Sequence, residues 1–192
     1  MSGMTELDSR IIEIQQKVNR VIAIYDLELN PPLTESEISE FERHYDITFP
    51  AEYRAFVTRI ANGVTVPYFS LFSLQKSLTY LDWESSAYND FLKTPFIHTS
   101  AYNPDEDSKL LQLEEELNQG KISEAEFNLI CDYLTAGTLI ISDGRCGYYE
   151  RLVITGATRG KVWGDGNVPG QGFLPRNWSF LDWYEKCLQG EC

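Results

Sequence analysis

Hydrophobic residues near the N-terminus recur at intervals of three and four positions, which is the period of an α-helix. They are Leu7, Ile11, Ile14, Val18, Val21 and Tyr25. This spacing places them on one side of a helix of about five turns, predicted at residues 5–26. Asn30, Pro31 and Pro32 end this helix, because proline cannot donate the backbone hydrogen bond that another turn requires. We expect the stripe to pack on the protein's own core, since so short a repeat rarely joins a second chain.

A second helix is predicted after Thr34, whose hydroxyl can cap the N–H groups of a first helical turn. Glu37 follows three residues later and can complete a capping box, while Leu33 and Ile38 can form a hydrophobic staple. A third helix is predicted to begin near Pro50, because proline is well tolerated in a first helical turn. Asn62-Gly63 is predicted to end it. Its inner face is predicted to contain Tyr53, Phe56, Val57 and Ile60.

Residues 138–163 contain three β-rich runs separated by short glycine-containing turns, which predicts an antiparallel meander. The first run, residues 139–142, is almost continuously apolar, as expected of a strand covered on both faces. In the second run, alternating side chains between Tyr149 and Thr155 give the strand two different faces. We expect this meander to be the centre of a sheet that helices cover. Further strands are predicted at residues 64–66, 69–72 and 95–98.

The remaining segments include a helix predicted at residues 74–83, which can also extend to residue 92. Residues 164–175 are rich in glycine and are predicted to form a loop. Ser179 is predicted to cap a final helix. The side of that helix predicted to pack on the sheet contains Phe180, Trp183, Tyr184, Cys187 and Leu188.

Residues 103–135 are strongly acidic and are predicted to form a pair of helices. Gly120 closes the first helix, and Ser123 with Glu126 forms the predicted capping box of the second, where Ile122 and Phe127 can act as a staple. The predicted inward-facing residues are Leu110, Leu113 and Leu117 in the first helix, and Phe127, Ile130, Cys131 and Leu134 in the second.

The formal net charge of the 192-residue chain is −13, and the whole excess comes from two segments. Residues 103–132 contain nine acidic and two basic residues, while residues 1–58 contain eleven and five. A surface this acidic repels nucleic acid phosphates and attracts a basic partner. A simpler interpretation is that acidic helices only keep the protein in solution.

Hydrophobic residues form 43% of the chain, which is enough for a sizeable core, and we expect one domain over residues 1–192. No run approaches the roughly 20 apolar residues that cross a bilayer. Residues 1–8 lack a basic segment followed by an apolar one, so we expect no signal peptide. We therefore expect a cytoplasmic protein that binds neither membrane nor nucleic acid. The four cysteines contain no CxxC pair, and free thiols are expected.

Candidate catalytic chemistry is sparse. His44 lies on the predicted outer side of an acidic helix, and His98 lies in an apolar run where a structural hydrogen bond is expected. Asp143, Glu150 and Asp165 could supply carboxylates to one site, but their spacing does not define their separation. We expect no catalytic residue, no metal and no cofactor, because histidine and cysteine do not occur at the short spacings that metal sites use.

Five features occur in order along the chain. They are Leu33-Thr34-x-x-Glu37-Ile38-x-x-Phe41-Glu42, Ile47-x-Phe49-Pro50-x-x-Tyr53-x-x-Phe56, Asn62-Gly63, the sheet block from Gly144-Arg145-Cys146-Gly147 through Leu152-x-x-Thr155-Gly156 to Gly160-x-Val162-Trp163, and Ser179-Phe180-x-x-Trp183-Tyr184. This ordered set makes the chain resemble the SUKH superfamily, and specifically its Smi/Knr-type family. Two departures are Phe49, where the family usually has leucine, and residues 103–135, which resemble an insertion.

The resemblance implies an α+β fold in which helices pack on a mixed, largely antiparallel sheet. It also implies a non-enzymatic immunity protein that binds and neutralises a cognate toxin domain, such as a nuclease. The alternative is an intracellular scaffold or regulatory module of the cell-wall or signalling type, as for fungal members. The fold alone would license neither function.

Acidic and aromatic residues are the candidates for partner binding, because a basic nuclease cleft can be filled by carboxylates. For each residue taken alone, a solvated acid or a core aromatic residue is the better explanation, so the hypothesis concerns the set as a whole. The candidates are Glu106, Asp107, Glu114, Glu115 and Glu116 in the acidic helical pair, Glu37 and Glu40 in the second helix, and Tyr148, Trp163 and Asp165 in and after the meander.

Overall fold

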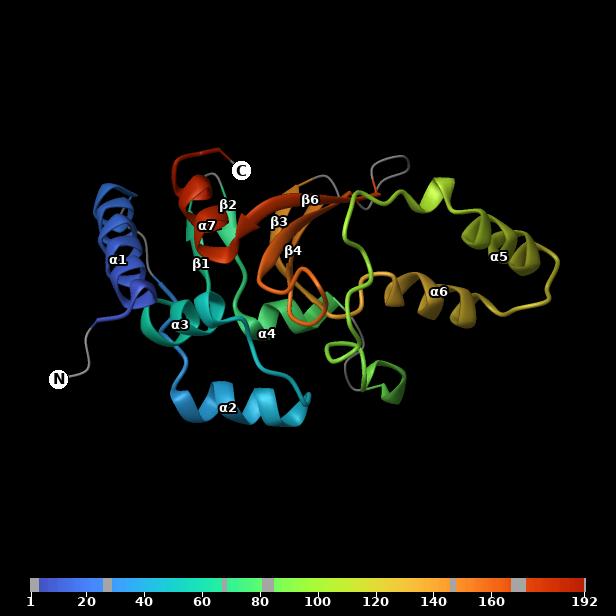
Figure 1. Ribbon diagram of the computed structural model, residues 1–192, viewed down its shortest axis with the longest axis horizontal. Helices are drawn as coiled ribbons and strands as arrows, with labels where there is room; N and C mark the ends of the chain where they lie inside the picture. The colour runs from blue at the N-terminus through green and yellow to red at the C-terminus, as the bar shows by residue number, and fades with distance from the viewer. Residues whose placement is uncertain are drawn as a thin grey trace.

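The structure, a computed structural model, describes residues 4–25, 29–66, 69–80, 85–145, 148–166 and 172–191. An antiparallel sheet lies in the middle of the molecule, with helices on both of its faces (Figure 1). Its six strands follow one another in chain order, and each pairs with the next. The strands are β1 Val64–Val66, β2 Phe69–Leu71, β3 Thr138–Arg145, β4 Tyr148–Val153, β5 Lys161–Gly166 and β6 Gly172–Ser179.

The predicted meander is confirmed as β3, β4 and β5. Leu139, Ile140 and Ile141 are 1%, 7% and 0% exposed, so consecutive side chains are buried, as expected of a strand covered on both faces. Every described strand pairing is antiparallel, and the isolated bridge between Phe96 and Gly156 is parallel. The α+β architecture is therefore confirmed, with no parallel pair among the described strands.

Two predictions about strands are wrong. The segment 164–175 is not simply a loop, because β5 continues to Gly166 and β6 begins at Gly172. Residues 167–171, in the middle of that predicted loop, lie outside the described residues. Residues 95–98 form no strand and contribute only the bridge at Phe96. Strand β6 was not predicted because it contains Pro175, and proline is unusual in a strand. A strand at the edge of a sheet tolerates it.

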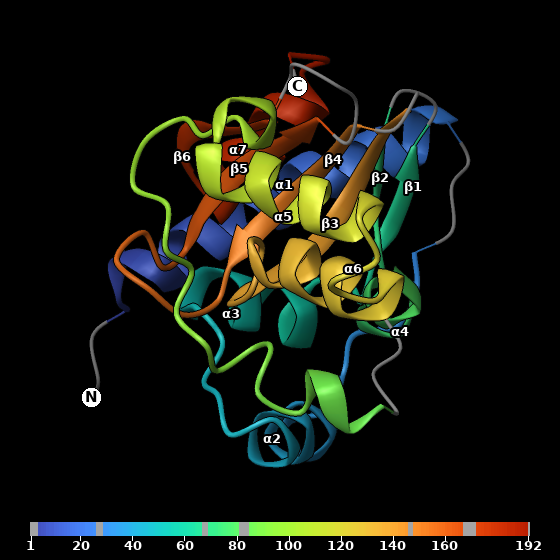
Figure 2. The ribbon, with the colours of Figure 1, turned by 90° about the vertical axis from the view of Figure 1, so that its right-hand side faces the viewer.

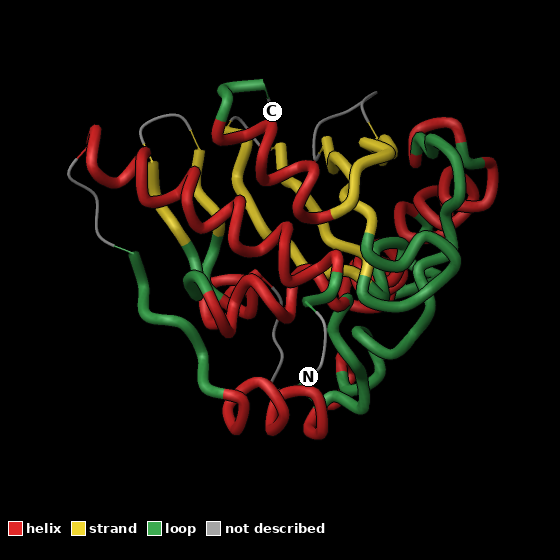
Figure 3. Tube along the Cα trace, turned by 60° about the vertical axis from the view of Figure 1, so that its left-hand side comes forward, coloured by secondary structure: helices red, strands yellow, loops and turns green. Residues whose placement is uncertain are grey.

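On one face of the sheet lie α1 Glu6–Tyr25, α3 Ala51–Arg59 and α7 Phe180–Leu188, and Figure 3 shows α1 and α7 lying across the strands. Helix α7 contacts β5 and β6, while α1 packs against α3 and α7. This layer encloses the larger hydrophobic core, in which Phe56 and Trp183 are fully buried. Helix α2 Glu35–His44 packs beside α3. The capping boxes at Thr34, Ser123 and Ser179 are all present.

The other face is covered by α5 Ser108–Asn118 and α6 Glu124–Tyr133, which lie in front of the strands in Figure 2. A smaller core lies there, formed by Phe96, Val153, Trp163 and Phe173. The predicted helical pair is confirmed, with Leu110 buried, but Ile130 is 39% exposed and does not face inward as expected.

Within the described residues, the helix predicted at residues 74–83 is a single α-turn, α4 Leu74–Ser77, followed by the 3₁₀ turn Leu78–Tyr80, and residues 81–84 lie outside the described residues. Ser86–Tyr88 and Pro104–Glu106 form further short 3₁₀ turns. Cys131 is free, whereas Cys187 is disulfide-bonded, so the expectation of free thiols is wrong at Cys187.

The segment before the acidic helices is tied to the sheet at two glycines. The Phe96 N–H donates to the Thr155 carbonyl, and the Thr155 hydroxyl donates to the Leu92 carbonyl. Gly156 has a φ of +119°, and a Cβ there would lie 2.6 Å from the Phe96 carbonyl oxygen. A Cβ on Gly137 would lie 2.4 Å from the Thr94 carbonyl oxygen. Only glycine fits these positions. The close approach of the two backbones therefore fixes where the segment leading to α5 and α6 meets the sheet.

Candidate interaction surface and adjoining pocket

The acidic hairpin, residues 103–135, presents carboxylates on its outer surface. Glu106, Glu114 and Glu115 are exposed, and Glu116 is half-buried. Glu115 and Glu116 accept hydrogen bonds from the neutral amides of Gln119 and Gln112. Within the described parts of the chain, Glu114, Glu115 and Glu116 form no ion pair. Their charges are therefore not neutralised by a neighbouring lysine or arginine.

Asp107 has a structural role at the start of α5. Its carboxylate accepts from the N–H of Lys109 at 2.8 Å and from the Tyr102 hydroxyl at 2.8 Å. The Tyr102 hydrogen bond is the largest of the contacts that lower the pKa of Asp107. Of the five candidates in the hairpin, Asp107 is thus the one that caps a helix.

Glu37 and Glu40 lie on α2, away from the acidic hairpin (Figure 1). Glu37 accepts from the backbone N–H and the hydroxyl of Thr34, and these bonds lower its pKa. The side chain of Glu40 is 75% exposed and lies 4.0 Å from Arg43. The fold therefore does not bring the two predicted acidic clusters into one patch.

The aromatic candidates differ in their exposure. Tyr148 is 39% exposed at the start of β4, and it remains a candidate anchor. Trp163 is 1% exposed and packs edge-on against Phe96 with ring centroids 5.0 Å apart. The expectation that Trp163 is a surface anchor is wrong, because the second layer covers its side of β5.

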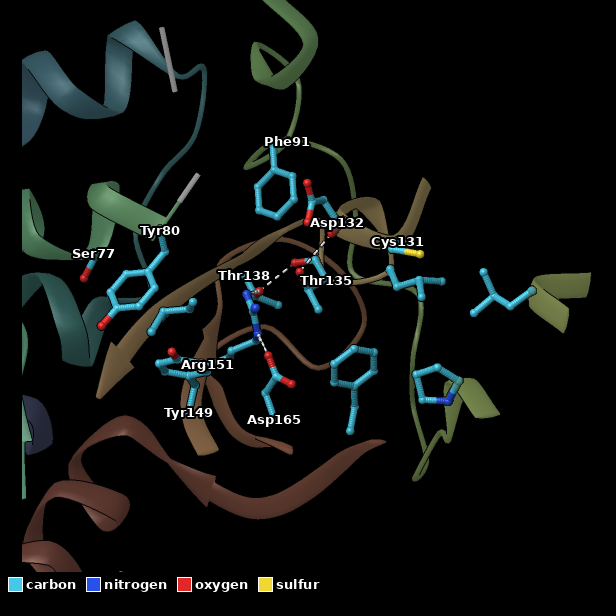
Figure 4. Close-up of a pocket in the computed structure, with 15 residues that line it drawn as sticks. Ser77, Tyr80, Phe91, Cys131, Asp132, Thr135, Thr138, Tyr149, Arg151 and Asp165 are labelled. Carbon is cyan, nitrogen blue, oxygen red and sulfur yellow. Dashed lines mark hydrogen bonds and ion pairs between the residues drawn. The ribbon is translucent and has the colours of Figure 1, made fainter. Parts of the chain in front are cut away.

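A pocket of about 330 Å³ lies between the sheet and the acidic hairpin (Figure 4). Its floor is an ion pair in which the Arg151 Nε donates to Asp165 Oδ2 at 2.5 Å. The two side chains are 13% and 7% exposed. Arg151 Nη1 also donates to the Thr138 hydroxyl oxygen at 3.3 Å, and that hydroxyl donates to the Thr135 carbonyl at 2.6 Å. Asp165 is therefore a buried pocket residue, not part of an exposed acidic patch.

The opposite side of the pocket is the C-terminal end of α6. Cys131 and Asp132 lie there, with Thr135 just beyond the helix (Figure 4). The Tyr88 hydroxyl donates to Asp132 Oδ2 at 2.6 Å. Asp132, Thr135, Thr138 and Arg151 were not predicted. The sequence offered one sign of this site. Asp132 lies in the last turn of a helix, where the negative end of the helix dipole disfavours an acidic residue.

The arrangement does not assemble a carboxylate site from Asp143, Glu150 and Asp165. Glu150 points to the other side of β4, where Arg176 binds it with Nη2 at 2.6 Å from Oε1. Burial raises the pKa of Glu150, and the hydrogen bond from Arg176 opposes that rise. Among the described residues, no group of three or more His, Cys, Asp or Glu side chains is placed to hold a metal.

The two histidines have the environments that their neighbours predict. His44 is exposed on α2. His98 Nε2 lies 3.1 Å from the Leu134 carbonyl oxygen, and the ring stacks on Tyr102 with centroids 4.2 Å apart. Burial lowers the pKa of His98. His98 thus joins the segment before the hairpin to the end of α6 and has a structural role.

No helix within the described ranges is both long and apolar enough to cross a membrane. A search of the curated proteins finds no match to the chain. A family model described as SMI1 / KNR4 family (SUKH-1) matches residues 32–185, which include all the strands and every helix except α1 at the N-terminus and the last residues of α7. The resemblance drawn from the sequence motifs is therefore confirmed, and the chain belongs to the SMI1 / KNR4 family (SUKH-1).

Proposed function

We propose that this protein is a non-enzymatic immunity protein that binds a cognate toxin domain and blocks its active site. The SUKH family is known for toxin-immunity proteins, which supports the general kind of function. The observation that favours this proposal most is the set of carboxylates on the acidic hairpin, where Glu114, Glu115 and Glu116 have no ion-pair partner among the described residues.

The partner that fits this surface is a basic nuclease domain. A nuclease holds a phosphate backbone in a cleft of positive charge, and a row of carboxylates can occupy the same cleft. Residues 103–132 contain nine acidic and two basic residues, so the hairpin attracts such a cleft over a distance. This attraction raises the association rate, while apolar contacts from residues such as Tyr148 slow dissociation.

The proposed contact residues are Glu106, Glu114, Glu115 and Glu116, with Tyr148 at the end of the sheet. Asp107 supports them by capping α5. We infer that the hairpin is an insertion in the domain, so that it can differ between relatives while the sheet stays the same. The exposed patch on α2 with Glu40 is a second, separate surface.

The first experiment is affinity capture from the source cells at low and high salt, read by mass spectrometry. A single abundant basic partner with a toxin-like domain, captured less at high salt, is expected. Several weaker partners from signalling or cell-wall pathways would instead support the scaffold alternative.

The second experiment reverses charge on the hairpin in the variant E114K/E115K. The control E6K/E13K makes the same change in net charge on α1, where both residues are also exposed. Only the hairpin variant is expected to slow capture of the toxin domain and to lose protection of cells that express it. Equal effects of the two variants would mean that only net charge matters and would reject the hairpin as the contact.

A further inference from the structure

We propose that the pocket between the acidic hairpin and the sheet receives a lysine or arginine side chain from the bound partner. This inference rests on the proposed function, because it identifies where part of that basic partner docks. Its volume of about 330 Å³ is roughly ten times the ~30 Å³ that one water molecule occupies in the liquid. It is therefore large enough for a long side chain.

The pocket has an excess of negative charge at the end of α6. Asp132 lines it, and this helix has no basic residue in its last turn. The C-terminal end of a helix holds roughly half a negative charge from its backbone dipoles. The Asp132 carboxylate is therefore repelled by the negative end of the helix dipole, and a cation in the pocket would relieve that repulsion.

Glu114 adds to this field from the other helix of the hairpin. The carboxylates of Asp132 and Glu114 both raise the pKa of the Cys131 thiol, on which burial has the largest effect. Both carboxylates therefore lie near Cys131, which also lines the pocket. Cys131 and Asp132 line the pocket, and Glu114 lies on α5, the helix of the hairpin that packs against α6.

Arg151 is the only lysine or arginine in the pocket lining among the described residues. Asp165 balances its charge at 2.5 Å, so this pair adds no net charge to the pocket. The remaining carboxylate in the lining is Asp132, whose Oδ2 accepts from the neutral Tyr88 hydroxyl. An anionic guest would meet this uncompensated charge, whereas an ammonium or guanidinium group would neutralise it.

The walls suit the hydrocarbon part of such a side chain. Leu110, Leu134 and Phe91 line the pocket next to polar groups from Thr135 and Asp132. Lysine and arginine bury their methylene stems on apolar surface while the charged head contacts polar groups. Apolar walls beside a carboxylate are therefore complementary to a basic side chain rather than to a bare metal ion.

The test uses the full chain labelled with ¹⁵N and two probes, N-acetyl-lysine-N′-methylamide and its neutral counterpart N-acetyl-norleucine-N′-methylamide. NMR titrations at about 50 mM salt limit screening. The lysine probe is expected to cause saturable shifts in the amide signals of Cys131, Asp132 and Thr135, while the norleucine probe does not. The variant D132N is expected to weaken this binding about tenfold or more, and the control E13Q to leave it unchanged.

D132N keeps an oxygen that can accept from Tyr88, so its melting temperature is expected to stay within about 5 °C of the parent. Equal shifts with both probes, no saturable shift at these amides, or unchanged binding in D132N would each overturn the proposal. The titration needs no partner protein. Lysine binding without toxin capture would reject the proposed function alone, whereas capture without lysine binding would reject the pocket alone.

Discussion

Removing one member of the Arg151–Asp165 pair is expected to be strongly destabilising. The side chains are 13% and 7% exposed, so water screens the pair much less than it screens a surface pair. Removing one partner of a buried pair costs about 3–5 kcal/mol, because the other charge is left without a counterion. We expect D165L and R151M to fall near the lower end, about 3 kcal/mol, since Arg151 also borders the pocket.

The assay is equilibrium urea unfolding followed by circular dichroism. With a denaturant slope of about 2 kcal/mol/M, a loss of about 3 kcal/mol lowers the midpoint by about 1.5 M. The double variant R151M/D165L should recover most of this loss, because a buried ion pair can often be replaced by apolar residues without cost. The control R176M disrupts the Glu150 pair, in which Arg176 is 39% exposed, and should cost less than D165L.

Two results would refute this reasoning. If D165L cost about 1 kcal/mol or less, the pair would behave like an exposed one, and the pocket would be open enough to hydrate Arg151. If R151M/D165L were as unstable as the sum of the single variants, the two charges would not be coupled in the folded protein.

Three further predictions concern stability. In urea unfolding, G156A should lower stability by well over 1 kcal/mol, because its Cβ would lie 2.6 Å from the Phe96 carbonyl oxygen. The control G120A should lower stability less, because Gly120 also has a positive φ but its Cβ would meet no atom within 4 Å. S179A should cost about 1 kcal/mol by the same assay, because it removes the cap of the buried helix α7; no change would mean that Asp182 alone caps it. Burial raises the pKa of Glu150 above its ordinary 4.5, so the folded state holds this proton more tightly than the unfolded state. Stability should therefore fall as pH rises from about 4.5 towards the raised pKa. In urea midpoints measured against pH, E150Q should remove this slope.

Local patterns predicted the helices well because their determinants lie close together in the chain. The capping boxes at Thr34, Ser123 and Ser179 each join residues three positions apart, and all three are present. The failures were segments without such a local signal. Strand β6 contains Pro175 and is held by pairing with β5, while residues 95–98 have a strand-like composition but contribute only one bridge.

The candidate surface was predicted in part. The acidic residues of the hairpin are largely exposed, as acidic residues on a helix usually are, but their composition did not indicate that Asp107 caps α5. Trp163 was misjudged because alternation along a strand separates two faces without saying what covers each one. Phe96, far away in the sequence, covers it.

The sequence by itself determined where most of the long helices begin, the central meander, the family and the concentration of negative charge. These follow from hydrophobic period, capping within one turn and motif order, all of which act over short stretches of chain. The tertiary structure decided that the acidic hairpin lies on the second face of the sheet and that a pocket remains beneath it. It also decided that Asp132 meets this pocket together with the Arg151–Asp165 pair. Such placements depend on contacts between segments distant in the chain, such as the close backbone approaches of residues 94–96 to Gly137 and Gly156, which short-range patterns do not encode.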